Sequence, residues 1–251
     1  MEEGIYIYCI VESKEPRLFG AIGIGGRGDE VYTVSFKDIG AVVSNSPVKK
    51  YPVSRENLIP HERVIEEVMK THTVLPVRFA TIAENEEKVR LILEREYRKF
   101  IDLLKDMQGK KELGLKIMFK EELVYKEILE KNDDIKALKE KIAQVSPEKS
   151  YHQRMEIGRM VEAALQKERE FHKEDALSRL SPLSEQTRTN NTYGDLMIMN
   201  AAFLVVKERE EEFDAEVQGL ADRYGEKVRF KYVGTLPPFN FVNLVISMEN
   251  K

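Results

Sequence analysis

The chain has 251 residues, of which 42% are apolar and 33% charged, and its formal net charge at neutral pH is −4. Domains of about 100–150 residues are usual, so this length predicts two domains. No window holds the roughly 18 consecutive apolar residues that a membrane-spanning helix needs. Neither half carries the basic excess that binding of nucleic acid requires. We therefore expect a protein that has neither nucleic acid nor membrane as a partner.

The start of the chain and its single cysteine limit the remaining classes. Residues 1–4 are acidic and lack the basic and apolar regions of a signal peptide, which predicts a cytoplasmic protein. One cysteine excludes an intramolecular disulfide and any site with two thiolate ligands. Cys9 lies in an apolar, strand-like stretch, where a buried and unreactive thiol is expected.

The first half of the sequence is predicted to form short strands and two helices. Alternating and β-branched residues predict strands at 4–11, 31–36, 39–44, 74–82 and 112–118. The two-residue break at Lys37-Asp38 favours a hairpin. Apolar residues at helical spacing predict helices at about 54–72, with Ser54 as N-cap, and at 84–107.

The second half begins with helices and then repeats the mixed pattern. A helix at 121–145 with a break near 132–134 is followed by a helix of roughly 30 residues that starts at Ser146-Pro147 and ends at Leu180. Residues 181–194 are polar and predict a loop. Further elements are expected as strands at 196–206, 227–233 and 241–247 and a helix at 208–224.

This order predicts an α+β protein with two domains, each with a ferredoxin-like core in which helices cover a sheet. We expect an N-terminal α+β domain at 1–118 and a C-terminal domain at 119–251. The second domain would contain a helical hairpin (121–180) at its start and an α+β core (195–247).

Motifs for catalysis, metals and cofactors are missing or lack the required context. Gly23–Gly28 matches the dinucleotide fingerprint, but a strand rather than a helix is predicted to follow, so the glycines indicate a turn. The histidines lack metal-ligand spacing and are expected to be solvated or to cap helices. We therefore expect no enzyme and no cofactor. Two alternatives stay open, a ligand-sensing regulatory module and an enzyme with an unrecognised carboxylate site.

Three segments have a composition that is unusual for an ordinary solvent-exposed surface. Tyr6 and Tyr8 share one face of the first strand. The stretch 75–81 (LPVRFAT) places Arg78 within an apolar strand, so we expect its guanidinium to be buried and paired. The stretch 234–241 (GTLPPFNF) predicts a stiff aromatic turn.

Together these segments resemble the GvpL/GvpF family of gas vesicle proteins. That family has a Y-x-Y-x-[IV] strand, a helix with H-E-x-[VL], an LPVRFGT stretch and a terminal G-P-x-P-P-Y-x-F turn. Here the helix motif begins at His61, Ala80 stands in place of the family's Gly, Thr235 in place of Pro, and Phe239 in place of Tyr.

The resemblance implies a non-enzymatic, minor structural or accessory protein of gas vesicles, the hollow protein-walled organelles of some prokaryotes. It implies binding to the hydrophobic shell protein GvpA, and possible binding to other gas vesicle proteins, in support of vesicle assembly. The candidate structural or partner-binding residues are Arg78, Phe79, Pro237, Pro238, Phe239 and Phe241.

Overall fold

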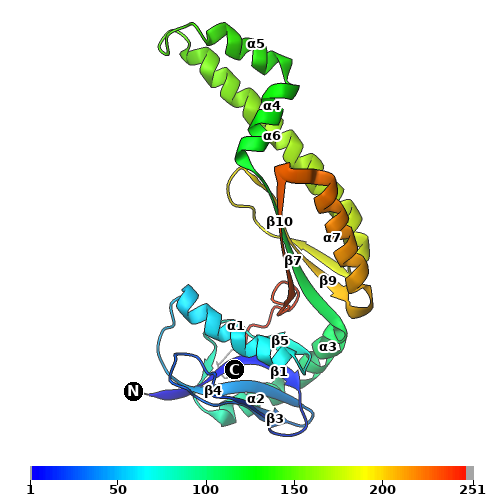
Figure 1. The fold of residues 1–251 in the computed structure, drawn as a ribbon. Helices are drawn as coiled ribbons and strands as arrows, with labels where there is room; N and C mark the ends of the chain where they lie inside the picture. Colours follow the sequence, from blue (N-terminus) through cyan, green and yellow to red (C-terminus); the bar gives the residue numbers. More distant parts are fainter. Residues whose placement is uncertain (1, 247–251) are drawn as a thin grey trace. The chain divides into compact units, whose positions relative to one another are not determined.

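The computed structural model describes residues 2–246 and has an α+β fold, in agreement with the sequence prediction. It divides into two compact units, whose strands and helices are labelled in Figure 1. Unit 1 contains the described residues 2–112 and 235–246, and unit 2 contains residues 113–234.

The expected division after residue 118 therefore needs correction, because residues 113–118 belong to unit 2 and residues 235–246 belong to unit 1. The physical reason is burial. Val242 and Leu244 are each 3% exposed, and Asn240 bonds to the buried carboxylate of Glu112. A core made from both ends of a unit cannot be read from the order of strands and helices alone.

Unit 1 is built on a six-stranded sheet in which β1 is central. Its strands are β1 (Glu3–Glu12), β2 (Leu18–Gly20), β3 (Val31–Phe36), β4 (Ile39–Pro47), β5 (Val74–Pro76) and β6 (Ile82–Ala83). The order is β2-β3-β4-β1-β5, and β6 also pairs with β1. All the described pairings among these six strands are antiparallel. The predicted hairpin is confirmed, since Phe36 pairs with Ile39 across Lys37-Asp38.

Three helices cover this sheet: α1 (Arg55–Met69), α2 (Glu86–Arg95) and α3 (Tyr97–Met107). Ser54 occupies the predicted N-cap position of α1, but its hydroxyl caps no backbone N–H and instead accepts a hydrogen bond from Asn57 Nδ2 (3.2 Å). The single helix expected at 84–107 is broken at Glu96, whose backbone leaves the helical region (φ −98°, ψ 10°). The break lets α2 contact β3 and β4 while α3 contacts β5 and β1.

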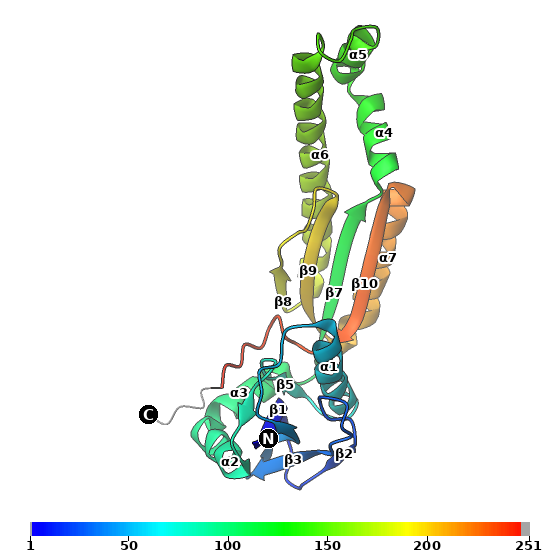
Figure 2. The ribbon, with the colours of Figure 1, turned by 90° about the vertical axis from the view of Figure 1, so that its left-hand side faces the viewer.

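Unit 2 contains a four-stranded sheet with the order β10-β7-β9-β8. Its strands are β7 (Lys110–Phe119), β8 (Gln186–Thr189), β9 (Met197–Val206) and β10 (Val228–Leu236). Helices α6 (Tyr151–Leu180) and α7 (Glu210–Tyr224) lie behind the sheet in Figure 2. This succession of strands and helices is compatible with the predicted ferredoxin-like core.

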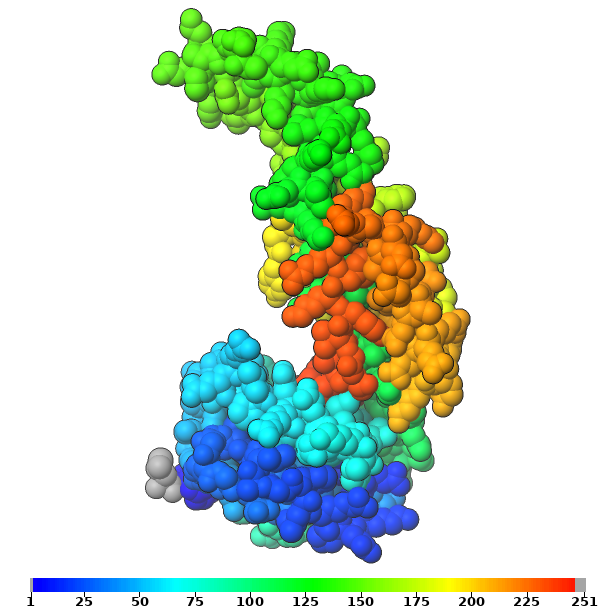
Figure 3. Space-filling model, viewed as in Figure 1, coloured from blue at the N-terminus to red at the C-terminus, as the bar shows by residue number. Residues whose placement is uncertain are grey.

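The predicted helical hairpin follows β7 in the chain, so it is inserted within this core; the sequence prediction places the strand at 112–118 in the other domain. Helices α4 (Glu121–Lys131) and α5 (Asp133–Ile142) are separated by a break at Asn132 and pack on the first half of α6. Residues of α4 and α5 form most of the green surface at the top of Figure 3. Among residues 2–246, none of the helices has the length and apolar composition that a membrane span requires.

Three further elements differ from the sequence prediction. Helix α6 begins at Tyr151, after a buried Ser150, instead of at Ser146-Pro147. The predicted loop 181–194 contains the polar strand β8. The run expected as a strand at 241–247 makes one isolated parallel bridge, Val77 with Leu244, and Ser247 lies outside the described residues.

Candidate functional site: an aromatic cluster around His61

The segments singled out in the sequence meet in unit 1 around the imidazole of His61. The hydroxyl oxygen of Tyr6 lies 3.1 Å from His61 Nδ1. The His61 ring lies 5.8 Å from the ring of Tyr8, 5.5 Å from that of Phe79 and 6.1 Å from that of Phe239, between ring centroids. We call these five residues the His61 cluster. It joins β1, α1, the turn after β5 and the turn after β10.

Tyr6 and Tyr8 hold two loops in place. Both side chains are fully buried and follow the strand period of two. The Tyr6 hydroxyl accepts a hydrogen bond from the backbone N–H of Ala80 (2.9 Å). The Tyr8 hydroxyl accepts one from the backbone N–H of Ile24 (2.7 Å) and lies 2.8 Å from Ser44 Oγ. Each tyrosine therefore connects the sheet to a loop distant in sequence.

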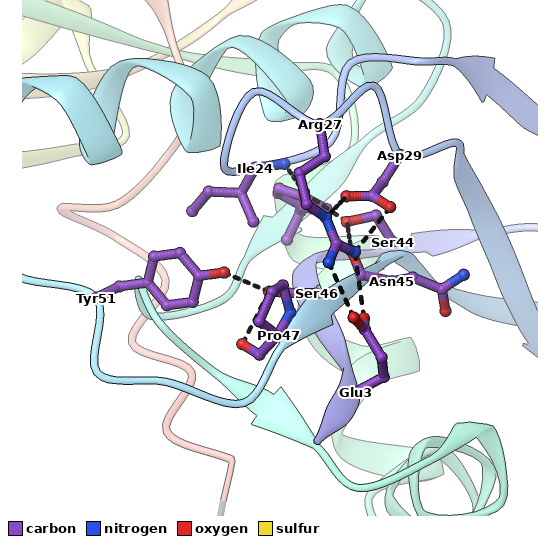
Figure 4. A network of polar contacts seen from close by, with 10 residues as sticks. Glu3, Ile24, Arg27, Asp29, Ser44, Asn45, Ser46, Pro47 and Tyr51 are labelled. Carbon is purple, nitrogen blue, oxygen red and sulfur yellow. Dashed lines mark hydrogen bonds and ion pairs between the residues drawn. The ribbon is translucent and has the colours of Figure 1, made fainter. Parts of the chain in front are cut away.

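The glycine-rich stretch is such a loop, and Figure 4 shows the contacts around it. The Arg27 guanidinium bonds to Asp29 (Nε to Oδ2, 2.8 Å) and to Glu3 (2.9 Å). Strand β3 follows it at Val31, so the glycines open no helix, as the sequence predicts. The nearby Tyr51 hydroxyl lies 2.6 Å from Ser46 Oγ. These contacts explain the stretch as an ordered turn.

Arg78 lies in a turn and not in a strand, which corrects the sequence prediction. Strand β5 ends at Pro76, and residues 78–80 turn towards β6. The Arg78 side chain is exposed, and its guanidinium makes no ion pair or hydrogen bond within residues 2–246. The turn is held instead by the Thr81 hydroxyl, which donates to the Arg78 carbonyl (2.6 Å). A turn sends this charged side chain into water, where it needs no partner.

The second turn, at 237–241, combines a fixed backbone with an exposed ring. Pro237 and Pro238 are buried. Asn240 donates two hydrogen bonds to Glu112, from its backbone N–H (3.0 Å) and its side chain (2.6 Å). Phe241 is half-buried, whereas Phe239 is 39% exposed. The turn therefore holds one aromatic side chain at the surface.

Burial disfavours the charged forms of His61, Tyr6, Tyr8 and Cys9. It lowers the pKa of His61 to about 4, and the Val77 backbone opposes this effect weakly. Burial also raises the pKa of Tyr8 to about 12, and it raises the pKa values of Tyr6 and Cys9 well above their ordinary ranges. These directions oppose general acid–base or nucleophilic roles at neutral pH. Within residues 2–246, no group of three or more His, Cys, Asp or Glu side chains could hold a metal ion.

His61 is the member of the cluster that reasoning from residue types missed. It was expected to be solvated or to cap a helix, but it is 1% exposed. The signal was present in the helical pattern, because His61, Val64, Ile65 and Val68 recur at the spacing of one buried face.

Comparison with known proteins gives a consistent result over nearly the whole chain. Residues 4–243 match the model of a family described as "Gas vesicle synthesis protein GvpL/GvpF". Gas vesicle protein F of Nostoc sp. is 26% identical over 249 residues, which are 97% of this chain and 100% of that protein. Gas vesicle protein F of Haloferax mediterranei is 24% identical and covers 100% of this chain and 99% of its own length.

Two solved structures are similar to this fold. The crystal structure of GvpF from Anabaena sp. superposes with a TM-score of 0.81 at 25% identity and covers 97% of this chain and 99% of its own. The structure of GvpF from Microcystis aeruginosa has a TM-score of 0.74 at 26% identity, with coverages of 96% and 99%.

Proposed function

Because this chain belongs to the GvpL/GvpF family of gas vesicle proteins, we propose that it is a minor structural or accessory protein that binds the hydrophobic shell protein GvpA and supports vesicle assembly. Gas vesicles would then be its place of action. The family is not a known enzyme family, and the perturbed pKa values described above agree with a binding role.

The observation that supports this proposal best is the exposure of Phe239. Its ring is 39% exposed, although the turn that carries it is fixed by buried prolines and by the bonds of Asn240 to Glu112. A rigid aromatic side chain loses little conformational entropy when it is covered, and such residues dominate many binding interfaces. An apolar shell protein supplies the surface that an exposed phenyl ring would contact.

Neighbouring side chains would complete the contact. Phe79 and Phe241 are half-buried and Arg78 is exposed. In this arrangement the prolines and Phe79 support the surface, and Phe239 and Arg78 face the partner. We therefore assign Arg78 to the rim of the interface, where a charge contributes little affinity.

A binding assay on the full-length chain tests the proposal. Tagged chain and GvpA are co-expressed, and GvpA retention is measured for the wild type and for Phe239→Ala. We expect retention at about 0.5 M salt, because apolar contacts are weakly screened. We expect Phe239→Ala to weaken binding by about tenfold or more. Val53→Asp is the matched control, because Val53 is an 80% exposed apolar residue of the same unit.

The two parts of the proposal fail in different ways. If the folded wild-type chain does not retain GvpA, the functional proposal is wrong. If Phe239→Ala retains GvpA as well as the wild type does, the assignment of the contact to the turn at 237–241 is wrong.

A further inference from the structure

His172, on α6 in unit 2, is a buried polar side chain without hydrogen bonds. It is 4% exposed, and neither ring nitrogen has a hydrogen-bond partner within residues 2–246. The nearest carboxylate oxygen, Glu168 Oε2, lies 3.6 Å from Nε2. Unsatisfied buried groups are rare because they lose hydration without compensation. This position therefore calls for a physical explanation.

Aromatic rings enclose the imidazole. The centroids of Phe119 on β7, Phe171 on α6 and Tyr224 on α7 lie 5.6, 5.4 and 4.5 Å from that of His172. The Tyr224 hydroxyl oxygen lies 3.0 Å from the His172 carbonyl and 2.9 Å from Asp175 Oδ2, and these two acceptors share its single proton, which therefore points away from the His172 ring.

Charged groups from the adjoining elements lie beside this pocket of rings. Lys227 Nζ, next to β10, lies 3.0 Å from Glu127 Oε2 on α4 and 3.8 Å from Glu168 Oε2 on α6. Glu127 also pairs with Lys131 on α4. On the other side, Asp175 pairs with Arg179 on α6 and Arg223 on α7. Lys227 thus links α4 to α6 at the base of the helical hairpin.

We propose that His172, Glu168 and Lys227 form an acid-sensitive latch that holds α4 against α6. In the closed latch His172 is neutral, and Glu168 is available to Lys227. A proton on His172 makes its ring a double donor. Nε2–H then draws Glu168 away from Lys227, and Nδ1–H faces aromatic rings and reaches an acceptor only when water enters. Protonation therefore opens the base of the hairpin.

The direction of the pH dependence follows from the surroundings. Burial, and then the charge of Lys227, lower the pKa of His172, while Glu168, Glu127 and Asp175 oppose this less strongly. The open form binds the proton with the ordinary pKa of about 6.5. The latch is therefore fully closed above that pH and weakens as the pH falls towards the lowered pKa. Between the ordinary pKa of the open form and the lowered pKa of the closed form, the open fraction rises about tenfold for each unit by which the pH falls.

Amide hydrogen exchange of the full-length chain, corrected for intrinsic rates, tests the latch. Between pH 7.5 and 5.5 we expect the protection of α4 (Glu121–Lys131) to fall in the wild type. His172→Phe preserves the aromatic packing without a titrating group, and this variant should lose the pH response. His172→Gln also removes the titrating group but introduces a smaller side chain, and it should lose the pH response as well. His152→Gln is the matched control, since His152 is an exposed histidine of the same helix and its loss should change nothing.

Either of two results would overturn the latch. One is a pH response of α4 that persists in both His172 variants. The other is an NMR titration of the wild type in which the His172 ring shows an ordinary or raised pKa. The test requires no shell protein, so its outcome is independent of the proposed function.

Discussion

Ala80 adopts a backbone conformation that is unfavourable for an L-amino acid with a side chain. Its φ is 62°, in the left-handed region, and its N–H is held by the Tyr6 hydroxyl. The family motif that this stretch resembles has Gly here, which adopts positive φ without strain. We expect Ala80→Gly to stabilise the protein by about 0.5–1 kcal/mol, measured by thermal unfolding. Ala83→Gly, in the buried strand β6, should instead destabilise it, and equal effects would contradict this account.

His61 makes the stability of unit 1 depend on pH. Its pKa in the folded chain is about 4, below the ordinary value of about 6.5. The unfolded chain therefore binds the proton more tightly, and the contribution of neutral His61 is complete above pH 6.5 and is lost as the pH falls towards 4. The expected loss is on the order of 3 kcal/mol. The free energy of unfolding is measured with denaturant at pH 7 and at pH 4.5. We expect it to change less between these two pH values in His61→Gln than in the wild type. An equal change in both proteins would contradict the prediction.

At the scale of single elements, the contact between Asn240 and Glu112 contributes to holding the turn at 237–241. Glu112 is 2% exposed, and its burial raises the pKa of its carboxyl group while the bonds from Asn240 lower it. Asn240→Ala removes a side-chain donor and leaves a buried acceptor short of a partner, at a cost of about 1–3 kcal/mol. Thermal unfolding of Asn243→Ala, an exposed neighbour, provides the control. Equal stabilities of the two variants would show that the contact contributes nothing.

Elements whose signals are local could be predicted from the sequence. Helix α1 with its cap at Ser54, the hairpin at Lys37-Asp38 and the helix break near Asn132 follow from neighbouring residues. Strand β8 could not be predicted, because a polar stretch becomes a strand only through its pairing with β9. The break at Glu96 likewise depends on which strands α2 and α3 cover.

The candidate site was predictable in its residue types but not in its geometry. The tyrosine pair, Phe79 and Phe239 stood out by composition. Arg78 was placed wrongly, since the strand assumed around it ends at Pro76. His61 was missed because its neighbours come from segments far apart in sequence, although the periodicity of α1 marked its face as buried.

At the scale of the whole molecule, unit 1 depends on residues that follow unit 2. Deletion of 235–251 removes the buried Val242 and Leu244 and the partner of Glu112. We expect unit 1 to lose on the order of 5 kcal/mol, while unit 2, a continuous segment, keeps its protection. Amide hydrogen exchange, measured in one sample, reports the protection of unit 1 through α1 and that of unit 2 through α7. Full protection of α1 after the deletion would refute the dependence.

The insertion of unit 2 within unit 1 also sets an order of events during synthesis. A ribosome releases residues 113–234 before residues 235–246, so unit 2 can fold while unit 1 still lacks Val242, Leu244 and the turn that carries Phe239. The Phe239 ring consequently reaches its place after unit 2 has been synthesised, together with the residues that complete the core of unit 1. The Phe239 ring is therefore held in its fixed position only after residues 235–246 have joined the core of unit 1.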